Sequence, residues 1–61
     1  MIATVTRVFD VWKVEAEPKK PEEFLIDVEV FCDGLYRNHL LHRTGWREAI
    51  GIAPGDEVSI R

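Results

Sequence analysis

Three side chains in this sequence could bind a metal ion or form a nucleophile pair: Cys32, His39 and His42. Zinc needs four converging ligands, or three and a water molecule. His39 and His42 are three positions apart on an expected strand, which places them on opposite faces of a sheet. Cys32 falls on an apolar strand face, where burial disfavours the reactive thiolate. We therefore expect no metal, no cofactor and no enzymatic activity.

One segment of the chain interleaves positive charge with aromatic and imidazole rings. Its candidate binding residues are Tyr36, Arg37, His39, Arg43 and Arg47. Such a stretch can place arginines on phosphates while bases stack on rings, as small barrels do with single strands. In the alternative, the arginines are solvated or pair with Asp27 and Glu29 across the sheet.

The charge of the chain favours a protein partner for this segment over nucleic acid. Residues 1–33 hold four Lys or Arg and eight Asp or Glu, and residues 34–61 hold four and three, so the two parts carry −4 and +1 and the whole carries −3. Affinity for nucleic acid depends mainly on neutralising phosphates with Lys and Arg. We therefore expect weak nucleic-acid binding at most.

Residues 24–33 show the clearest strand pattern. The apolar positions of that strand alternate on one face: Phe24, Ile26, Val28, Val30 and Cys32. Acidic residues occupy the other face, at Asp27, Glu29 and Asp33. This alternation predicts a central strand with one side in the core.

Asp33-Gly34 predicts a two-residue type I′ turn, because that turn needs positive φ at both central positions. Residues 35–43 would return antiparallel and place Phe31 opposite Tyr36. The face that carries this aromatic pair also carries Leu25 and Leu40. Because a large apolar patch on a small protein usually marks a contact surface, we expect Leu25, Phe31, Tyr36 and Leu40 to mediate self-association.

The β-branched and aromatic stretch 2–15 changes the phase of its alternation partway. Ala3 and Val5 lie on one parity, and Trp12 and Val14 lie on the other. A β-bulge or bend within residues 7–10 would return both pairs to one core face. Two short strands joined by a turn at positions 9 and 10 are the alternative. The charged, proline-containing stretch 15–23 is expected to be an exposed loop between strands.

Residues 44–61 predict a short helix, a turn and a strand. Thr44 is the expected N-cap, and Trp46, Ala49 and Ile50 form a stripe expected to face the core. Gly51 suits a left-handed C-terminal position, and Ile52 could fold back on the last turn. The next residues, Ala53-Pro54-Gly55-Asp56, predict a type II turn into a strand over 57–60 that points Val58 and Ile60 inward.

These elements predict a single domain over residues 1–61, mainly β, with a small, strongly curved antiparallel sheet or small barrel. The expected order is strand, strand, strand, short helix, strand, with completion by a second chain left open. A chain of this length buries a small core, and one cysteine allows no internal disulfide, so we expect a homo-oligomer, most simply a dimer. The lone cysteine and the lack of a long apolar run favour a soluble, cytoplasmic protein. We further expect an accessory or regulatory protein of a prokaryote or phage.

The end of the chain resembles the helix-turn-strand signature of the swapped-hairpin regulators and antitoxins, the AbrB and MazE group. The matching residues are Arg47-Glu48-Ala49-Ile50-Gly51-Ile52-Ala53-Pro54-Gly55-Asp56-Glu57-Val58-Ser59-Ile60. The resemblance implies a homodimer that binds DNA through basic residues ahead of the helix.

The leading interpretation is a non-enzymatic cytoplasmic module that self-associates and binds a macromolecular partner, a protein, in an accessory or regulatory role. The first alternative is a DNA-binding regulator or antitoxin of the swapped-hairpin type. The second is a small barrel that binds single-stranded nucleic acid. No membrane contact and no small-molecule substrate is expected.

Overall fold

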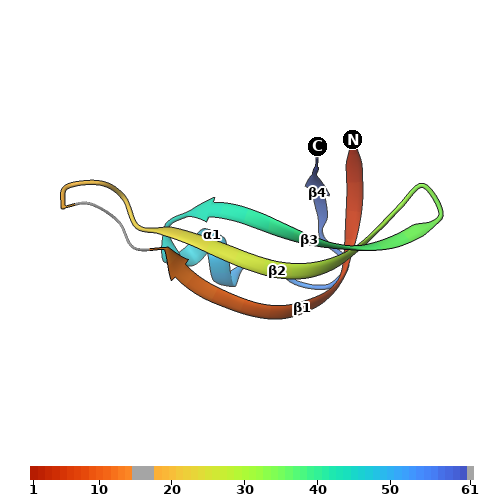
Figure 1. Ribbon diagram of the computed structural model, residues 1–61, viewed down its shortest axis with the longest axis horizontal. Helices are drawn as coiled ribbons and strands as arrows, with labels where there is room; N and C mark the ends of the chain where they lie inside the picture. The colour runs from red at the N-terminus through yellow and green to blue at the C-terminus, as the bar shows by residue number, and fades with distance from the viewer. Residues whose placement is uncertain (15–17, 61) are drawn as a thin grey trace.

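Strand β2 (Glu23–Cys32) occupies an inner position of a four-stranded sheet in the computed structural model, which describes residues 1–14 and 18–60. Its neighbours are β1 (Ile2–Val14) and β3 (Leu35–Thr44). The short helix α1 (Trp46–Ile50) precedes β4 (Glu57–Ser59), which pairs with the far side of β1 (Figure 1). The predicted element order is confirmed.

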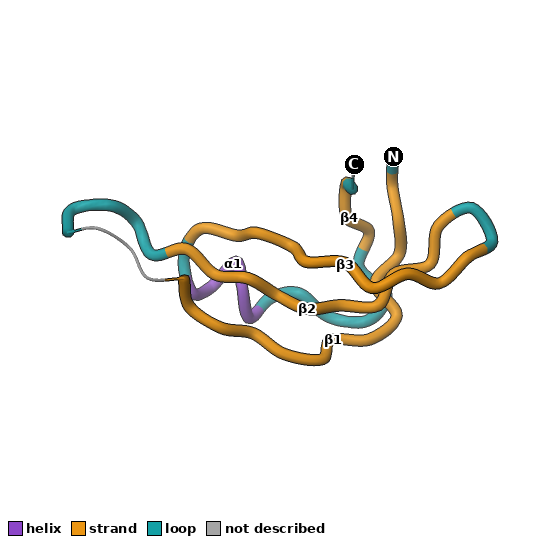
Figure 2. The backbone as a smooth tube through the Cα atoms, viewed as in Figure 1, coloured by secondary structure: helices purple, strands orange, loops and turns teal. Residues whose placement is uncertain are grey.

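The sheet is antiparallel throughout and curls into a half-barrel whose two edges are β3 and β4 (Figures 1 and 2). The core fills its concave side and consists of Ala3, Val5, Phe24, Ile26, Val28, Val30, Cys32, Leu41, Ala49, Val58 and Ile60. The predicted mainly β fold with a strongly curved sheet is confirmed.

The turn between β2 and β3 has the predicted type I′ geometry. Asp33 has a φ of 52° and Gly34 a φ of 76°, so both central residues lie in the left-handed region. Phe31 then pairs with Tyr36, and their ring centroids lie 4.9 Å apart. The register of the whole β2–β3 ladder follows from this turn, because it contains no shift from Cys32 to Glu23.

Strand β1 bends as predicted, but at two places. Its pairing with β2 shifts register between Val5 and Arg7 and again between Val8 and Asp10. Each shift inserts an extra residue and advances the inward face by one position, so Val8 and Val11 pack against the core.

The second shift makes one prediction about β1 wrong. Trp12 and Val14, which were expected to face the core, pair with Leu25 and Glu23 on the convex side. A single bulge would have restored their parity, whereas two bulges leave it reversed.

Both ends of α1 differ from prediction. Thr44 is the last residue of β3, where it pairs with Glu23, and it makes no cap hydrogen bond. The chain instead turns at Gly45, which has a φ of 89° and whose N–H donates to the Glu22 carbonyl at 2.8 Å. Gly51, expected to be left-handed, has a right-handed φ of −76°. The β2–β3 ladder thus extends further than the local cap signal indicates.

The stripe expected on α1 buries a single side chain. Ala49 is fully buried, but Trp46 is 57% exposed and Ile50 is 54% exposed. The Trp46 ring lies at the rim of the core, where its centroid is 5.5 Å from that of Phe24. A helix of five residues has one narrow contact with the sheet, which explains why a two-turn stripe does not form.

The turn into β4 is confirmed. Gly55 has a φ of 97°, and the Asp56 N–H donates to the Ala53 carbonyl at 3.1 Å, as a type II turn requires. Val58 and Ile60 are buried, as predicted. In the loop between β1 and β2, residues 18–22 are exposed as expected, and residues 15–17 lie outside the described residues.

The Phe24–Trp46 contact predicts unequal effects of two substitutions. Phe24→Ala removes a buried ring and should cost about 3–5 kcal/mol. Trp46→Ala removes a half-exposed ring and one aromatic pair, and should cost about 1 kcal/mol. The free energy of unfolding from urea titration of both variants measures this difference. Equal losses would contradict the exposed position of Trp46.

Candidate interaction surfaces

The cysteine and the two histidines do not converge. Cys32 is buried on the concave side, where its Sγ donates to the Ile2 carbonyl at 3.6 Å. His39 pairs with Val28 on the concave side and His42 with Leu25 on the convex side, so the predicted separation is confirmed. The His42 Nε2 lies 3.4 Å from the Glu23 Oε2. Within residues 1–14 and 18–60, no three His, Cys, Asp or Glu side chains are grouped to hold a metal ion.

The candidate binding residues of β3 are divided between the two faces of the sheet. Arg37, His39 and Arg43 pair with core-facing residues of β2 and therefore lie on the concave side. Tyr36 lies on the convex side against Phe31. The structure therefore does not bring the tyrosine ring and the arginines of β3 together on one surface.

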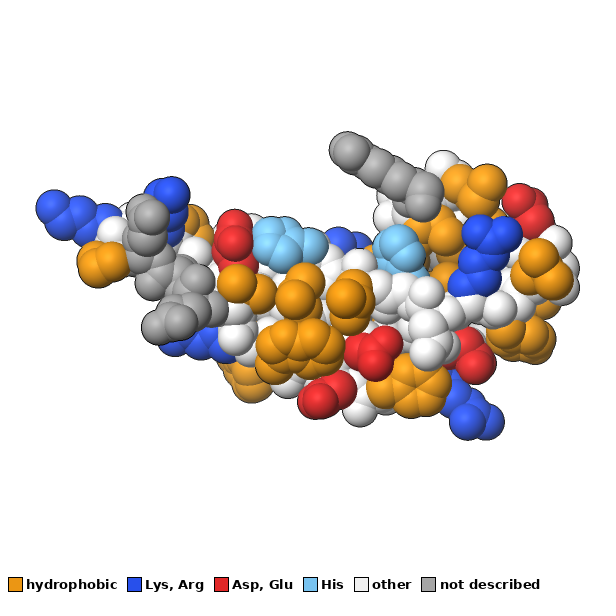
Figure 3. Space-filling model, viewed as in Figure 1, with side chains coloured by type: hydrophobic (Ala, Val, Ile, Leu, Met, Phe, Trp, Pro, Cys, Tyr) orange, Lys and Arg blue, Asp and Glu red, His pale blue; other side chains and the backbone are white. Residues whose placement is uncertain are grey.

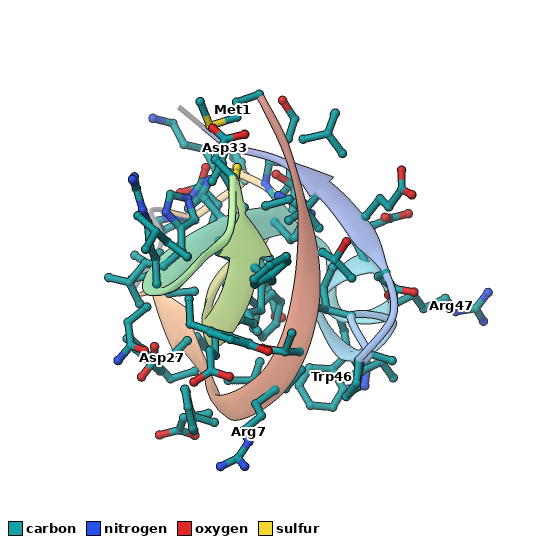
Figure 4. The ribbon with its side chains drawn as sticks, turned by 90° about the vertical axis from the view of Figure 1, so that its right-hand side faces the viewer. Met1, Arg7, Asp27, Asp33, Trp46 and Arg47 are labelled. Atoms are coloured by element: carbon teal, nitrogen blue, oxygen red, sulfur yellow. The ribbon has the colours of Figure 1, made fainter. Side chains whose placement is uncertain are left out.

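Arg47 extends from α1, away from the sheet. Figure 4, which looks along the half-barrel, shows it on the side of the helix, whereas Arg7 and Asp27 lie on the outside of the curl. Arg43 is half-buried, and its Nη1 donates to the His42 carbonyl at 2.7 Å.

The alternative in which Asp27 and Glu29 pair with the arginines of β3 is wrong, whereas solvated arginines remain compatible with the structure. Both carboxylates project from the convex side, because they alternate with the core residues of β2. The Glu29 carboxylate accepts a hydrogen bond from the Thr6 hydroxyl at 2.8 Å. Among the described residues, Arg37, Arg43 and Arg47 make no ion pair.

The four residues predicted to mediate self-association share the convex side. They form two groups along the sheet. Figure 3 shows hydrophobic side chains, in orange, exposed over the middle of the sheet and near the hairpin end. Phe31 and Tyr36 lie at the hairpin end, and Leu25 and Leu40 lie diagonally across β2 and β3 in the middle. Tyr36 is 66% exposed and Leu40 is 53% exposed. The Glu29–Asn38 pair separates the two groups.

The structure adds Trp12 to this surface, and Phe9 is a further large apolar residue that β1 leaves exposed. Trp12 lies beside Leu25, and Phe9 falls at the second bulge. The sequence signal for this was the dipeptide Val8-Phe9, which is apolar on both parities and marks a bulge. We use the name convex patch for Trp12, Leu25 and Leu40.

An open depression lies on the sheet near the hairpin end. It is lined by Thr6, Arg7, Glu29 and Tyr36. The Thr6 hydroxyl donates to the Glu29 carbonyl at 3.1 Å as well as to its carboxylate. No sequence pattern pointed to this group, because it depends on the first bulge in β1, which displaces Thr6 from regular pairing.

No described helix is long and apolar enough to span a bilayer. Residues 47–60, whose sequence resembles the swapped-hairpin regulators, comprise most of α1, the Pro54-Gly55 turn and β4, and membership of that family stays a prediction. Comparisons of the chain with family models, with curated proteins and with solved structures found no match.

Proposed function

We propose that this chain is a small non-enzymatic module that self-associates and binds a protein partner in an accessory or regulatory role. The observation that carries the proposal is the exposure of large apolar side chains on the convex side of the sheet. Apolar area of this kind gains free energy when it leaves water, at about 25 cal/mol per Å². Binding is therefore the function that this surface supports best.

The size of the core supports self-association. Among the described residues the core contains eleven buried apolar side chains, ten from the sheet and its ends and Ala49 from α1, and four of them are Val. Domains of this length usually gain stability from disulfides, metals or oligomerisation. The single cysteine cannot form an internal disulfide, and association of two copies would supply the missing stability.

Charge on the convex side indicates the chemistry of the partner. Asp10 pairs directly with Asp27 across β1 and β2, beside Leu40. Like charges in opposed positions repel, and a cation placed between them would relieve that repulsion. We therefore expect the protein partner to present an apolar side chain flanked by Lys or Arg.

The arrangement of reactive groups is also consistent with a binding role. Cys32 is enclosed in the core, and the two histidines lie on opposite sides of the sheet. A nucleophile and a general base must come within hydrogen-bond reach of each other.

A cytoplasmic location stays a prediction from the sequence.

Self-association predicts about twice the monomer mass in sedimentation at micromolar concentration. Leu40→Lys should shift the protein toward monomer, because it places a charge in the apolar contact. The new ammonium group would lie opposite the Asp27 carboxylate, so the fold should be retained. Ser59→Lys adds the same charge at an exposed site on β4 and should leave the mass unchanged. A monomeric wild-type protein would refute self-association.

Nucleic-acid binding is a second candidate that one observation favours. Arg37 and Arg43 lie on the concave side of the sheet. The carboxylates of Asp27 and Glu29, which could have neutralised them, lie on the convex side. This arrangement leaves a local positive field. Both the DNA-binding regulator of the swapped-hairpin type and the single-strand binder would use these arginines.

Salt dependence tests this candidate. If Arg37, Arg43 and Arg47 each neutralise a phosphate, the slope of log K against log salt should be about −2 to −3. Replacing all three by Ala should abolish oligonucleotide binding, measured by fluorescence anisotropy. The control variant Arg7→Ala, which removes a charge on the convex side opposite Glu29, should leave oligonucleotide binding unchanged. Absence of binding to DNA or RNA at about 50 mM salt would eliminate both nucleic-acid alternatives.

A further inference from the structure

Strand β3 has an unpaired edge. Among residues 1–14 and 18–60 it is the terminal strand of the sheet, and β2 is the one strand that pairs with it. This pairing runs for ten residues without a register shift. Proteins usually block such edges with proline, bulges or charged side chains, because an open edge pairs with other strands. Residues 35–44 contain no proline, no lysine and no bulge, and their charged side chains are Arg37 and Arg43.

The direction of the backbone groups on β3 follows from β2. The Glu29 carbonyl accepts a hydrogen bond from Thr6 of β1, so it points away from β3. Asn38, which lies opposite Glu29, therefore directs its own N–H and carbonyl to the free edge. Because the direction of these groups alternates along a strand, the N–H and carbonyl groups of Tyr36, Leu40 and His42 also point to the free edge.

One of these outward groups is already occupied. The His42 carbonyl accepts a hydrogen bond from the Arg43 guanidinium at 2.7 Å. The free part of the edge is therefore the segment from Tyr36 to Leu40. Three residues in this segment point their backbone N–H and carbonyl groups outward: Tyr36, Asn38 and Leu40. Their spacing is symmetric about Asn38.

We propose that this edge pairs antiparallel with the same edge of a second copy of the chain, about a two-fold axis at Asn38. The two half-barrels then share one eight-stranded sheet. The pairing exchanges backbone hydrogen bonds at Asn38 with Asn38 of the second copy, and twice at Tyr36 with Leu40. This inference rests on the proposed self-association and specifies its geometry.

The side chains fit this register. On the convex side, Tyr36 meets Leu40 of the second copy, so two exposed apolar residues cover each other at each end of the contact. Asn38 meets its own copy, and an amide can both donate to and accept from its equivalent. On the concave side, Arg37 faces His39 of the second copy.

Neighbouring registers fit less well. An axis at His39 would pair Tyr36 with His42, whose carbonyl is occupied. An axis at Leu40 would place Arg37 opposite Arg43 of the second copy, and opposed like charges are destabilising. Charge and hydrogen bonding therefore select the axis at Asn38.

Asn38→Pro tests the pairing without altering the β2–β3 ladder. Proline is tolerated on an edge strand where the lost N–H points away from the sheet, as the Asn38 N–H does. The substitution removes two hydrogen bonds from the symmetric contact, and we expect the dimer dissociation constant in sedimentation to rise by about tenfold or more. Circular dichroism checks that the sheet is retained.

Ser59→Pro is the matched control at the other edge of the sheet. The Ile60 N–H donates to the Met1 carbonyl, so the N–H of Ser59, one residue earlier, points away from β1. This variant should leave the dimer intact. If Asn38→Pro stays dimeric and Leu25→Lys, on the convex side of β2, dissociates, the copies pack face to face, which overturns the edge pairing and leaves self-association standing. A monomeric wild-type protein overturns both.

Cross-linking tests the register in a chain that keeps its backbone N–H groups. With Cys32→Ser, which can still donate to the Ile2 carbonyl, Asn38→Cys should form a covalent dimer on oxidation. Hydrogen-bonded pairs have Cα atoms about 5.5 Å apart, within disulfide range. Thr44→Cys, at the far end of β3, should not cross-link. Cross-linking at 44 and not at 38 would overturn the register.

Discussion

The ladder between β1 and β2 is the interaction on which the rest of this structure depends. The two strands pair at nine positions, and β1 can follow β2 only by inserting two extra residues. Each bulge increases the local twist, and together they turn a long strand around the core. The curl places β4 beside the start of β1, gives α1 a concave side to cover, and leaves Trp12 on the outside.

Features determined by a few neighbouring residues could be predicted from the sequence. The alternation in β2, the Asp33-Gly34 turn and the Pro54-Gly55 turn each depend on the intrinsic preferences of their own residues. The ends of α1 could not be predicted, because pairing of Thr44 with Glu23 overrides the local capping preference. The number of bulges in β1 is likewise a property of its ladder with β2.

The candidate surfaces likewise divide into features that neighbouring residues determine and features that depend on strand pairing. The shared face of Leu25, Phe31, Tyr36 and Leu40 follows from parity along a regular hairpin. The separation of Arg37 from Glu29 could have been predicted too, because the turn already sets Arg37 opposite Val30. Trp12 lies on this face because β1 has a second bulge. No local sequence pattern indicates how many bulges the strand contains.

The β2–β3 and β1–β4 ladders differ greatly in the length of chain that they close. The β2–β3 hairpin joins neighbouring residues through a two-residue turn, and hairpins of this kind form within about 1–10 μs. β4 pairs Ser59 with Ile2, so its contacts close nearly the whole chain and comprise three residue pairs. Contacts that are distant in sequence must overcome the entropy of closing a long loop, and elements with few contacts open at low free energy. We therefore expect the hairpin to form before the β1–β4 pairing, and β4, held by three residue pairs, to be the strand that detaches most readily.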